Sequence, residues 1–132
     1  MIQRNLEIGR WHVEFYFCPQ GYDLESILDR MYDFGASASK LRRALNLMES
    51  GELNRGFTFA NRIDRVALIV IGPTSGGAEF QDTLTHEILH LAVNIADSLG
   101  IDLRGETPAY SVGDSIRDLA DIVCNLGCTH CN

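Results

Sequence analysis

The chain of 132 residues lacks both the long apolar segments and the basic character that would place it in a membrane or on nucleic acid. Its longest apolar run, residues 66–71, is far shorter than the roughly 20 residues that span a bilayer. Only 11 residues are Lys or Arg against 18 Asp or Glu, which gives a formal net charge of −7. This charge argues against general nucleic-acid binding and against binding to anionic membranes, so we expect neither partner.

Signal-peptide features are also absent, and the chain contains four cysteines. The first ten residues contain no apolar segment of the secretory type, so we expect a cytoplasmic protein. In that compartment, cysteines favour free thiols or metal ligands over disulfides. The four thiols could form a second, structural metal site, with a disulfide or free thiols as the alternatives; they are Cys18, Cys124, Cys128 and Cys131.

Linkers are missing as well. The chain has three prolines, no internal repeat and no low-complexity segment. Its length and its apolar content of 45% suffice for one compact core. We therefore expect a single domain over residues 1–132.

Hydrophobic periodicity predicts an α+β fold with a small, mostly antiparallel sheet. Residues 10–18 alternate apolar and polar side chains, which indicates a strand with one buried face and with His12 exposed on the other. Residues 55–61 and 65–72 are predicted to form a β-hairpin, and the second of these is the most apolar strand of the chain. The sheet is expected to pack on a long helix that follows the hairpin.

Two helices are predicted between the first strand and the hairpin, over residues 22–34 and 37–50. The second carries a short basic run, Lys40, Arg42 and Arg43, on the side opposite its apolar residues. We interpret this run as a solvated helix face in preference to a binding patch.

The main functional signal lies in residues 83–99, within a helix predicted to start after Gly76-Gly77 and to end before Gly100. It contains His86-Glu87-Ile88-Leu89-His90, an H-E-x-x-H pattern. Two histidines four residues apart on a helix share one face, so both imidazoles can bind one zinc ion, and the glutamate can act on a water at that ion. The histidines project away from the apolar stripe of the helix, which consists of Phe80, Leu84, Ile88, Leu91, Ile95 and Leu99. Two surface histidines on an ordinary helix are the alternative.

The glycine-rich segment before this helix, residues 72–77, invites comparison with a phosphate-binding P-loop. That motif continues with Lys and then Ser or Thr, where this chain has Ala78 and Glu79. Without the lysine, and with a carboxylate in its vicinity, nucleotide binding is not expected. A loop in front of the metal site is the preferred interpretation.

A catalytic zinc site needs a third protein ligand. We predict that Glu106 supplies it from the start of a last helix, whose buried face is expected to be Ala109, Val112, Ile116, Leu119, Ala120 and Val123. Asp114 and Asp97 are the alternatives, although Asp97 lies about 10 Å beyond His90 along the helix axis. Tyr110, one turn after Glu106, could donate a hydrogen bond to an oxyanion or a substrate, and a half-buried packing tyrosine is the alternative.

The combination of His86-Glu87-x-x-His90 with Glu106 on the next helix resembles the zincin metallopeptidases, and among them the gluzincins. The last helix reads Glu106-x-x-x-Tyr110, where thermolysin-like gluzincins have aspartate in the final position. The chain also resembles small, uncharacterised H-E-x-x-H proteins of bacterial prophages and mobile elements, over roughly residues 56–121. These resemblances imply a minimal zincin-like domain with a C-terminal helix.

The zincin resemblance also implies a mechanism and a substrate. Zinc on His86, His90 and Glu106 would lower the pKa of a bound water, and Glu87 would take its proton and pass it to the leaving amine. The substrate would be a peptide or protein that pairs with the strand over residues 65–72, if this strand lies at the sheet edge. The alternative is a non-catalytic protein on the same scaffold, with an accessory role in a phage or mobile element.

Overall fold

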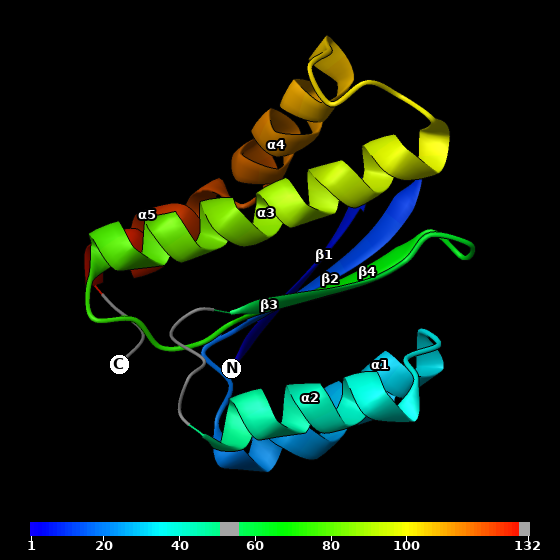
Figure 1. Ribbon diagram of the computed structural model, residues 1–132. Helices are drawn as coiled ribbons and strands as arrows, with labels where there is room; N and C mark the ends of the chain where they lie inside the picture. Colours follow the sequence, from blue (N-terminus) through cyan, green and yellow to red (C-terminus); the bar gives the residue numbers. More distant parts are fainter. Residues whose placement is uncertain (51–55, 130–132) are drawn as a thin grey trace.

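Four strands form one mixed sheet in the order β1-β2-β4-β3 (Figure 1). The structure, a computed structural model, describes residues 1–50 and 56–129, with side chains described up to residue 125. The strands are β1 (Ile2–Ile8), β2 (Trp11–Phe17), β3 (Phe57–Asn61) and β4 (Val66–Ile71). The β1–β2 and β3–β4 pairs are antiparallel hairpins, whereas β2 and β4 run parallel at the centre.

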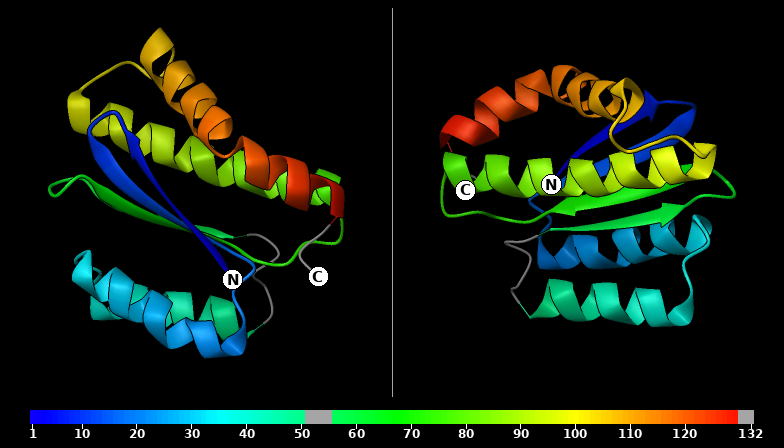
Figure 2. Two further views of the ribbon diagram at one scale, coloured as in Figure 1. Left: turned by 180° about the vertical axis from the view of Figure 1, so that it is seen from behind. Right: turned by 45° about the horizontal axis from the view of Figure 1, so that its top comes forward.

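Helices cover both faces of this sheet (Figures 1 and 2). On one side lie α1 (Leu24–Asp33), preceded by a single 3₁₀ turn, and α2 (Ala38–Glu49). On the other side lie α3 (Gly77–Leu99), α4 (Glu106–Asp118) and α5 (Ala120–Thr129). No helix among the described residues is long and apolar enough to cross a membrane.

The parallel pairing of β2 with β4 follows from the chain between them. Parallel neighbours need a crossover connection, and α1 and α2 lie within it. By contrast, β1 returns directly into β2 through Gly9 and Arg10, both with positive φ (56° and 68°). The expectation of an α+β fold with a mostly antiparallel sheet is confirmed, because two of the three strand pairings are antiparallel.

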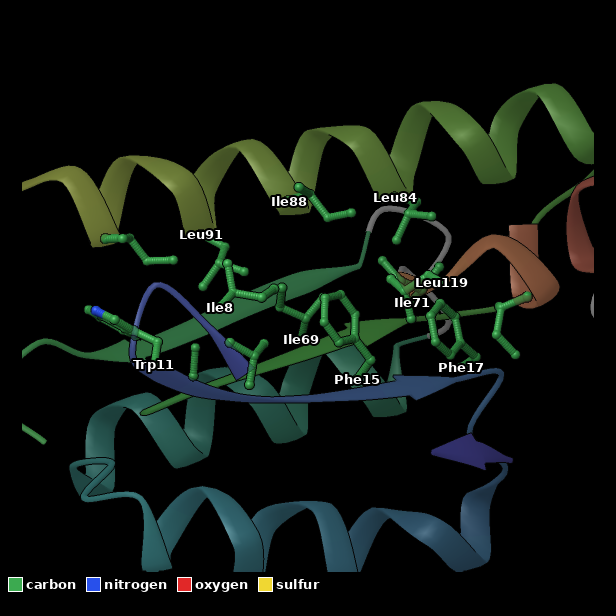
Figure 3. Close-up of a cluster of buried hydrophobic side chains, with 14 of the residues drawn as sticks. Ile8, Trp11, Phe15, Phe17, Ile69, Ile71, Leu84, Ile88, Leu91 and Leu119 are labelled. Carbon is green, nitrogen blue, oxygen red and sulfur yellow. The ribbon is translucent and has the colours of Figure 1, made fainter. Parts of the chain in front are cut away.

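The larger core lies between the sheet and α3 (Figure 3). Five of the six residues of the predicted helix stripe are at most 1% exposed, whereas Leu99 at the end of the helix is 42% exposed. The stripe packs on inward-facing residues of β2 and β4, among them Trp11, Phe15 and Ile69. This contact fixes the rotation of α3 about its own axis relative to the sheet.

The second face of β2 is buried too, which corrects the expectation of a strand with one wet face. Glu14 is 1% exposed and Tyr16 5% exposed beneath α1 and α2, and His12 is half-buried. The central strands of a sheet between two helical layers have no solvent-exposed face. The polar side chains of β2 therefore need hydrogen-bond partners within the protein.

Two further expectations are corrected. Strand β1 was not predicted, and the single C-terminal helix is divided into α4 and α5 near Leu119. Of the predicted buried face, Leu119 is buried and three residues pack against the core while partly buried, namely Val112, Ile116 and Val123. Ala109 and Ala120 are exposed, whereas Pro108, Ser111 and Ser115 are buried in addition. The two buried hydroxyls donate to backbone carbonyls four residues earlier, which satisfies them within the helix interface.

The edge strands of the sheet are β1 and β3, so β4 is not an edge strand. The apolar strand that was expected to pair with a substrate therefore lies between β2 and β3, with both neighbours already in place. Any additional strand on this side would have to pair with β3.

Glu14 is the centre of a polar network under α1. Arg30 on α1 donates to both of its carboxylate oxygens at 2.8–3.1 Å, and the Tyr16 hydroxyl donates to Oε1 at 2.7 Å. His12 lies between two carboxylates, with Nδ1 2.7 Å from Glu7 and Nε2 3.0 Å from Glu14. Hydrogen bonds to Glu7 and Glu14 raise the pKa of His12, since both ring nitrogens can then carry a proton.

Removal of Arg30 should destabilise the fold, because the buried Glu14 carboxylate would lose its principal donor. We expect Arg30→Met to lower the free energy of unfolding by about 2 kcal/mol, the scale of hydrogen bonds to a charged group. Asp33→Asn is the matched control, because it removes only the exposed 3.6 Å ion pair of Arg30 and should cost less than about 1 kcal/mol. Urea unfolding of the two variants measures the difference, and equal losses would contradict the assigned role of Glu14.

The same network should make stability sensitive to acid. Burial raises the pKa of Glu14, but hydrogen bonds from Arg30, His12 and Tyr16 outweigh it and lower this pKa from 4.5 to about 2. A depressed folded-state pKa contributes stability that is complete above pH 4.5 and is lost as the pH falls towards 2. We expect the difference in unfolding free energy between wild type and Glu14→Gln to shrink over this range. A difference independent of pH would show that Glu14 does not titrate as inferred.

Candidate functional site

The rotation of α3 points His86 and His90 towards the β3 side of the molecule. Both side chains are exposed, and their Nε2 atoms lie 3.1 Å apart. The two rings meet edge to face, with centroids 4.7 Å apart. The structure thus brings the two predicted metal-binding nitrogens together at one point beside the sheet edge.

Glu87 lies beneath this pair and is nearly inaccessible, at 4% exposure. Thr58 on β3 donates its hydroxyl to Glu87 Oε1 at 2.9 Å and also approaches the Glu87 carbonyl at 3.3 Å. Burial raises the pKa of Glu87, and the Thr58 hydrogen bond and the nearby histidines partly oppose this rise. Glu87 therefore connects the histidine helix to the edge strand.

A groove of about 560 Å³ opens where α3, β3 and α2 meet. Strand β3 lines its base, α3 contributes one wall and α2 the opposite wall. The polar and charged lining residues are Lys40, Arg43, Thr58, His86, Glu87, His90 and Asn94. The histidine pair therefore opens into a groove of a size that suits a small ligand or a peptide side chain.

Gly56 immediately precedes β3 and allows this strand to lie close to α3. Its φ is +65°, and a Cβ at this position would lie 2.7 Å from the Val70 carbonyl oxygen. The same Cβ would lie 3.2–3.3 Å from side-chain carbons of Thr83 and Glu87. Only glycine meets both constraints, so Gly56 determines how closely β3 approaches Glu87.

The other predicted site residues on the C-terminal side are not brought to the histidines. Helix α4 packs on α3 and β1, and β1 is the sheet edge opposite β3. Glu106 and Tyr110 are exposed on α4 and do not line the groove. The two alternatives pair elsewhere, Asp97 with Arg62 at 3.1 Å and Asp114 with Arg117 at 3.5 Å. Within residues 1–50 and 56–125, no group of three His, Cys, Asp or Glu side chains is placed to hold a metal ion.

The cysteines do not act together as four thiolates. Cys18 is disulfide-bonded, while Cys124 is an exposed free thiol. Cys131 and the side chain of Cys128 lie outside the described part of the chain. A disulfide sulfur is not a thiolate, so the structure corrects the suggestion that Cys18 contributes to a second metal site.

Sequence reasoning missed three groove residues. Thr58 lies in a predicted strand, and nothing in the sequence signals its hydrogen bond to Glu87, twenty-nine residues later. Lys40 and Arg43 were interpreted as a solvated face. Both are exposed, but they also line the groove opposite the histidines.

Comparison with known proteins adds no relative. No protein-family model, no curated protein and no solved structure matches this chain. The functional interpretation therefore depends on the geometry of the groove.

Gly56→Ala should disturb both the fold and the site, because the added methyl group meets Val70 and crowds Glu87. We expect it to lower the free energy of unfolding by about 2 kcal/mol or more, from backbone strain plus a steric clash. Gly100→Ala is the control, since Gly100 has nearly the same φ (+66°) with nothing within 4 Å of an added Cβ. It should cost about 1 kcal/mol from strain alone. Thermal or urea unfolding measures both, and equal losses would refute the close approach at Gly56.

Proposed function

We propose that the groove is a zinc-dependent site for hydrolysis of peptide or other amide bonds. The observation that carries the proposal is the convergence of His86 and His90, with 3.1 Å between their Nε2 atoms. The two ring nitrogens lie at hydrogen-bond distance from each other, so a single ion could contact both.

The separation fits shared coordination. Two nitrogen ligands, each about 2.0–2.1 Å from a tetrahedral zinc ion, lie roughly 3.3 Å apart. The described residues thus fit zinc at two positions, and Glu106 does not complete the set. When bound, zinc would supply an electrophile and lower the pKa of a water molecule.

Glu87 is the proposed proton-transfer residue. It follows His86 directly on α3, and the Thr58 hydroxyl holds its carboxylate on the groove side of the helix. In the proposed reaction Glu87 accepts a proton from the attacking water and delivers it to the leaving amine. Tyr110 has no part in this proposal, because it lies outside the groove.

The proposed substrate is an extended peptide. Strand β3 is the terminal strand of the sheet and lines the groove next to both histidines. Edge strands bind extended peptides through main-chain hydrogen bonds, with side-chain pockets adding specificity. A peptide beside β3 would place its backbone carbonyls close to the histidine pair.

A second candidate is a binding protein that uses the groove without catalysis. The observation that favours it is the missing third ligand among the described residues, since catalytic zinc sites generally use three protein ligands. An accessory role in a phage or mobile element belongs to this candidate and comes from resemblance alone. The two candidates predict different effects of the Glu87→Gln substitution. It should abolish hydrolysis if the protein is a hydrolase, and it should have no functional effect if the protein only binds its ligand.

The expected cytoplasmic location remains part of the proposal. The disulfide at Cys18 weighs against it, because disulfides are uncommon in a reducing compartment.

Zinc content tests the site directly. After zinc reconstitution and removal of loosely held metal, mass spectrometry should find about one zinc per wild-type chain and none in His86→Ala or His90→Ala. Glu87→Gln should keep the metal, because the proposal gives this residue no ligand role. Glu106→Ala should also keep it, since Glu106 lies on α4 away from the histidines.

Two outcomes would overturn parts of this proposal. Absence of zinc from the wild type would remove the metal and favour the binding protein. Loss of zinc in Glu106→Ala would show that α4 approaches the histidines when metal binds, as the gluzincin ligand set requires. With zinc confirmed, hydrolysis of a peptide library by wild type but not by Glu87→Gln would establish the activity.

A further inference from the structure

The groove has the opposite charge character from the protein as a whole. The chain carries a formal net charge of −7, yet Lys40 and Arg43 line the α2 wall. Among the described residues that line the groove, Glu87 is the only acid, and it is buried against Thr58. A ligand in the groove therefore meets two cations and two imidazoles on an otherwise acidic protein.

Neither cation is neutralised by a carboxylate within the described part of the chain. Lys40 and Arg43 form no ion pair with any described residue, whereas Arg30 and Arg62 are each paired with carboxylates. The Lys40 Nζ atom lies 5.2 Å from the centre of the Phe59 ring, so a cation–π contact directs it towards β3. The backbone of Lys40 is held in turn by the Ser37 side chain, which caps α2.

We propose that Lys40 and Arg43 bind a carboxylate of the ligand and make the groove selective for acidic peptides. The inference rests on the proposed function insofar as it takes the groove to be the peptide site. In this arrangement the peptide lies along β3 between the two walls. Its backbone faces the histidines, and an acidic group reaches the cations of α2.

The chemistry of the two side chains suits this role. A guanidinium group donates paired hydrogen bonds to a carboxylate, and an ammonium group adds a compact charge. Partial enclosure by three elements reduces solvent screening relative to an open surface. A carboxylate can come from an acidic side chain or from a free C-terminus, and the experiment below separates the two.

The test measures binding of short, capped peptides to the full chain without metal, so that no hydrolysis occurs. One peptide carries a central Glu, the second carries Gln at that position, and the third is the Gln peptide with a free C-terminal carboxylate. Titrations followed by NMR give the dissociation constants. We expect the Glu peptide to bind wild type about tenfold more tightly than the Gln peptide, the scale of one charge-assisted hydrogen bond.

Arg43→Gln should remove most of this preference, and Lys40→Gln should reduce it. Arg42→Gln is the matched control, because Arg42 neighbours Arg43 on α2 and carries the same charge but does not line the groove. It should leave the preference intact, and thermal unfolding checks that all three variants fold. Tight binding of the third peptide instead of the first would assign the carboxylate to a free C-terminus.

Three results would overturn the inference: equal binding of all peptides to wild type, no binding, or equal losses in Arg42→Gln and Arg43→Gln. The third result would show that overall charge attracts the peptide without a defined contact. Since the titrations use metal-free protein, failure to bind zinc would leave them unchanged. Conversely, a zinc-binding protein that ignores peptide charge would overturn this inference alone.

Discussion

The packing of the apolar stripe of α3 on the sheet is the constraint on which the rest of the site depends. With Leu84, Ile88 and Leu91 fixed against β2 and β4, the helix has one allowed rotation. That rotation turns the histidine face towards β3, brings Glu87 under it, and leaves Thr58 as the nearest hydroxyl on the edge strand. The groove is thus a consequence of core packing, because its polar residues occupy the flank of a helix that hydrophobic burial has already oriented.

Much of the fold could be predicted because hydrophobic periodicity reports burial directly. The β3–β4 hairpin and the long helix after it followed from runs of apolar residues with clear ends. Strand β1 was missed because Arg4 interrupts its alternation of apolar residues. Arg4 occupies a position on the half-buried side of the strand and pairs with Asp121 of α5 at 2.7 Å, a contact that no local pattern reveals.

The site was only partly predictable for a related reason. The spacing of His86 and His90 on one helix sets their proximity, so a local pattern was sufficient. Whether the next helix can supply a third ligand depends on where it packs. Helix α4 packs near β1, at the edge of the sheet opposite β3. The presence of Lys40 and Arg43 in the groove depends on where α2 packs relative to β3, which is again a property of tertiary packing. Sequence analysis therefore predicted that His86 and His90 share one face of α3, and it missed the groove residues supplied by other elements.

The position of β3 at the base of a groove also bears on self-association. An open edge strand is normally a site where a second sheet can add and start aggregation. Here α2 and α3 form walls on either side of that edge. A single extended segment can reach the strand between them, but another folded sheet would bring its own helical layers and collide with these walls. The same architecture that would admit one peptide under the proposed function therefore shields the β3 edge from pairing with another sheet.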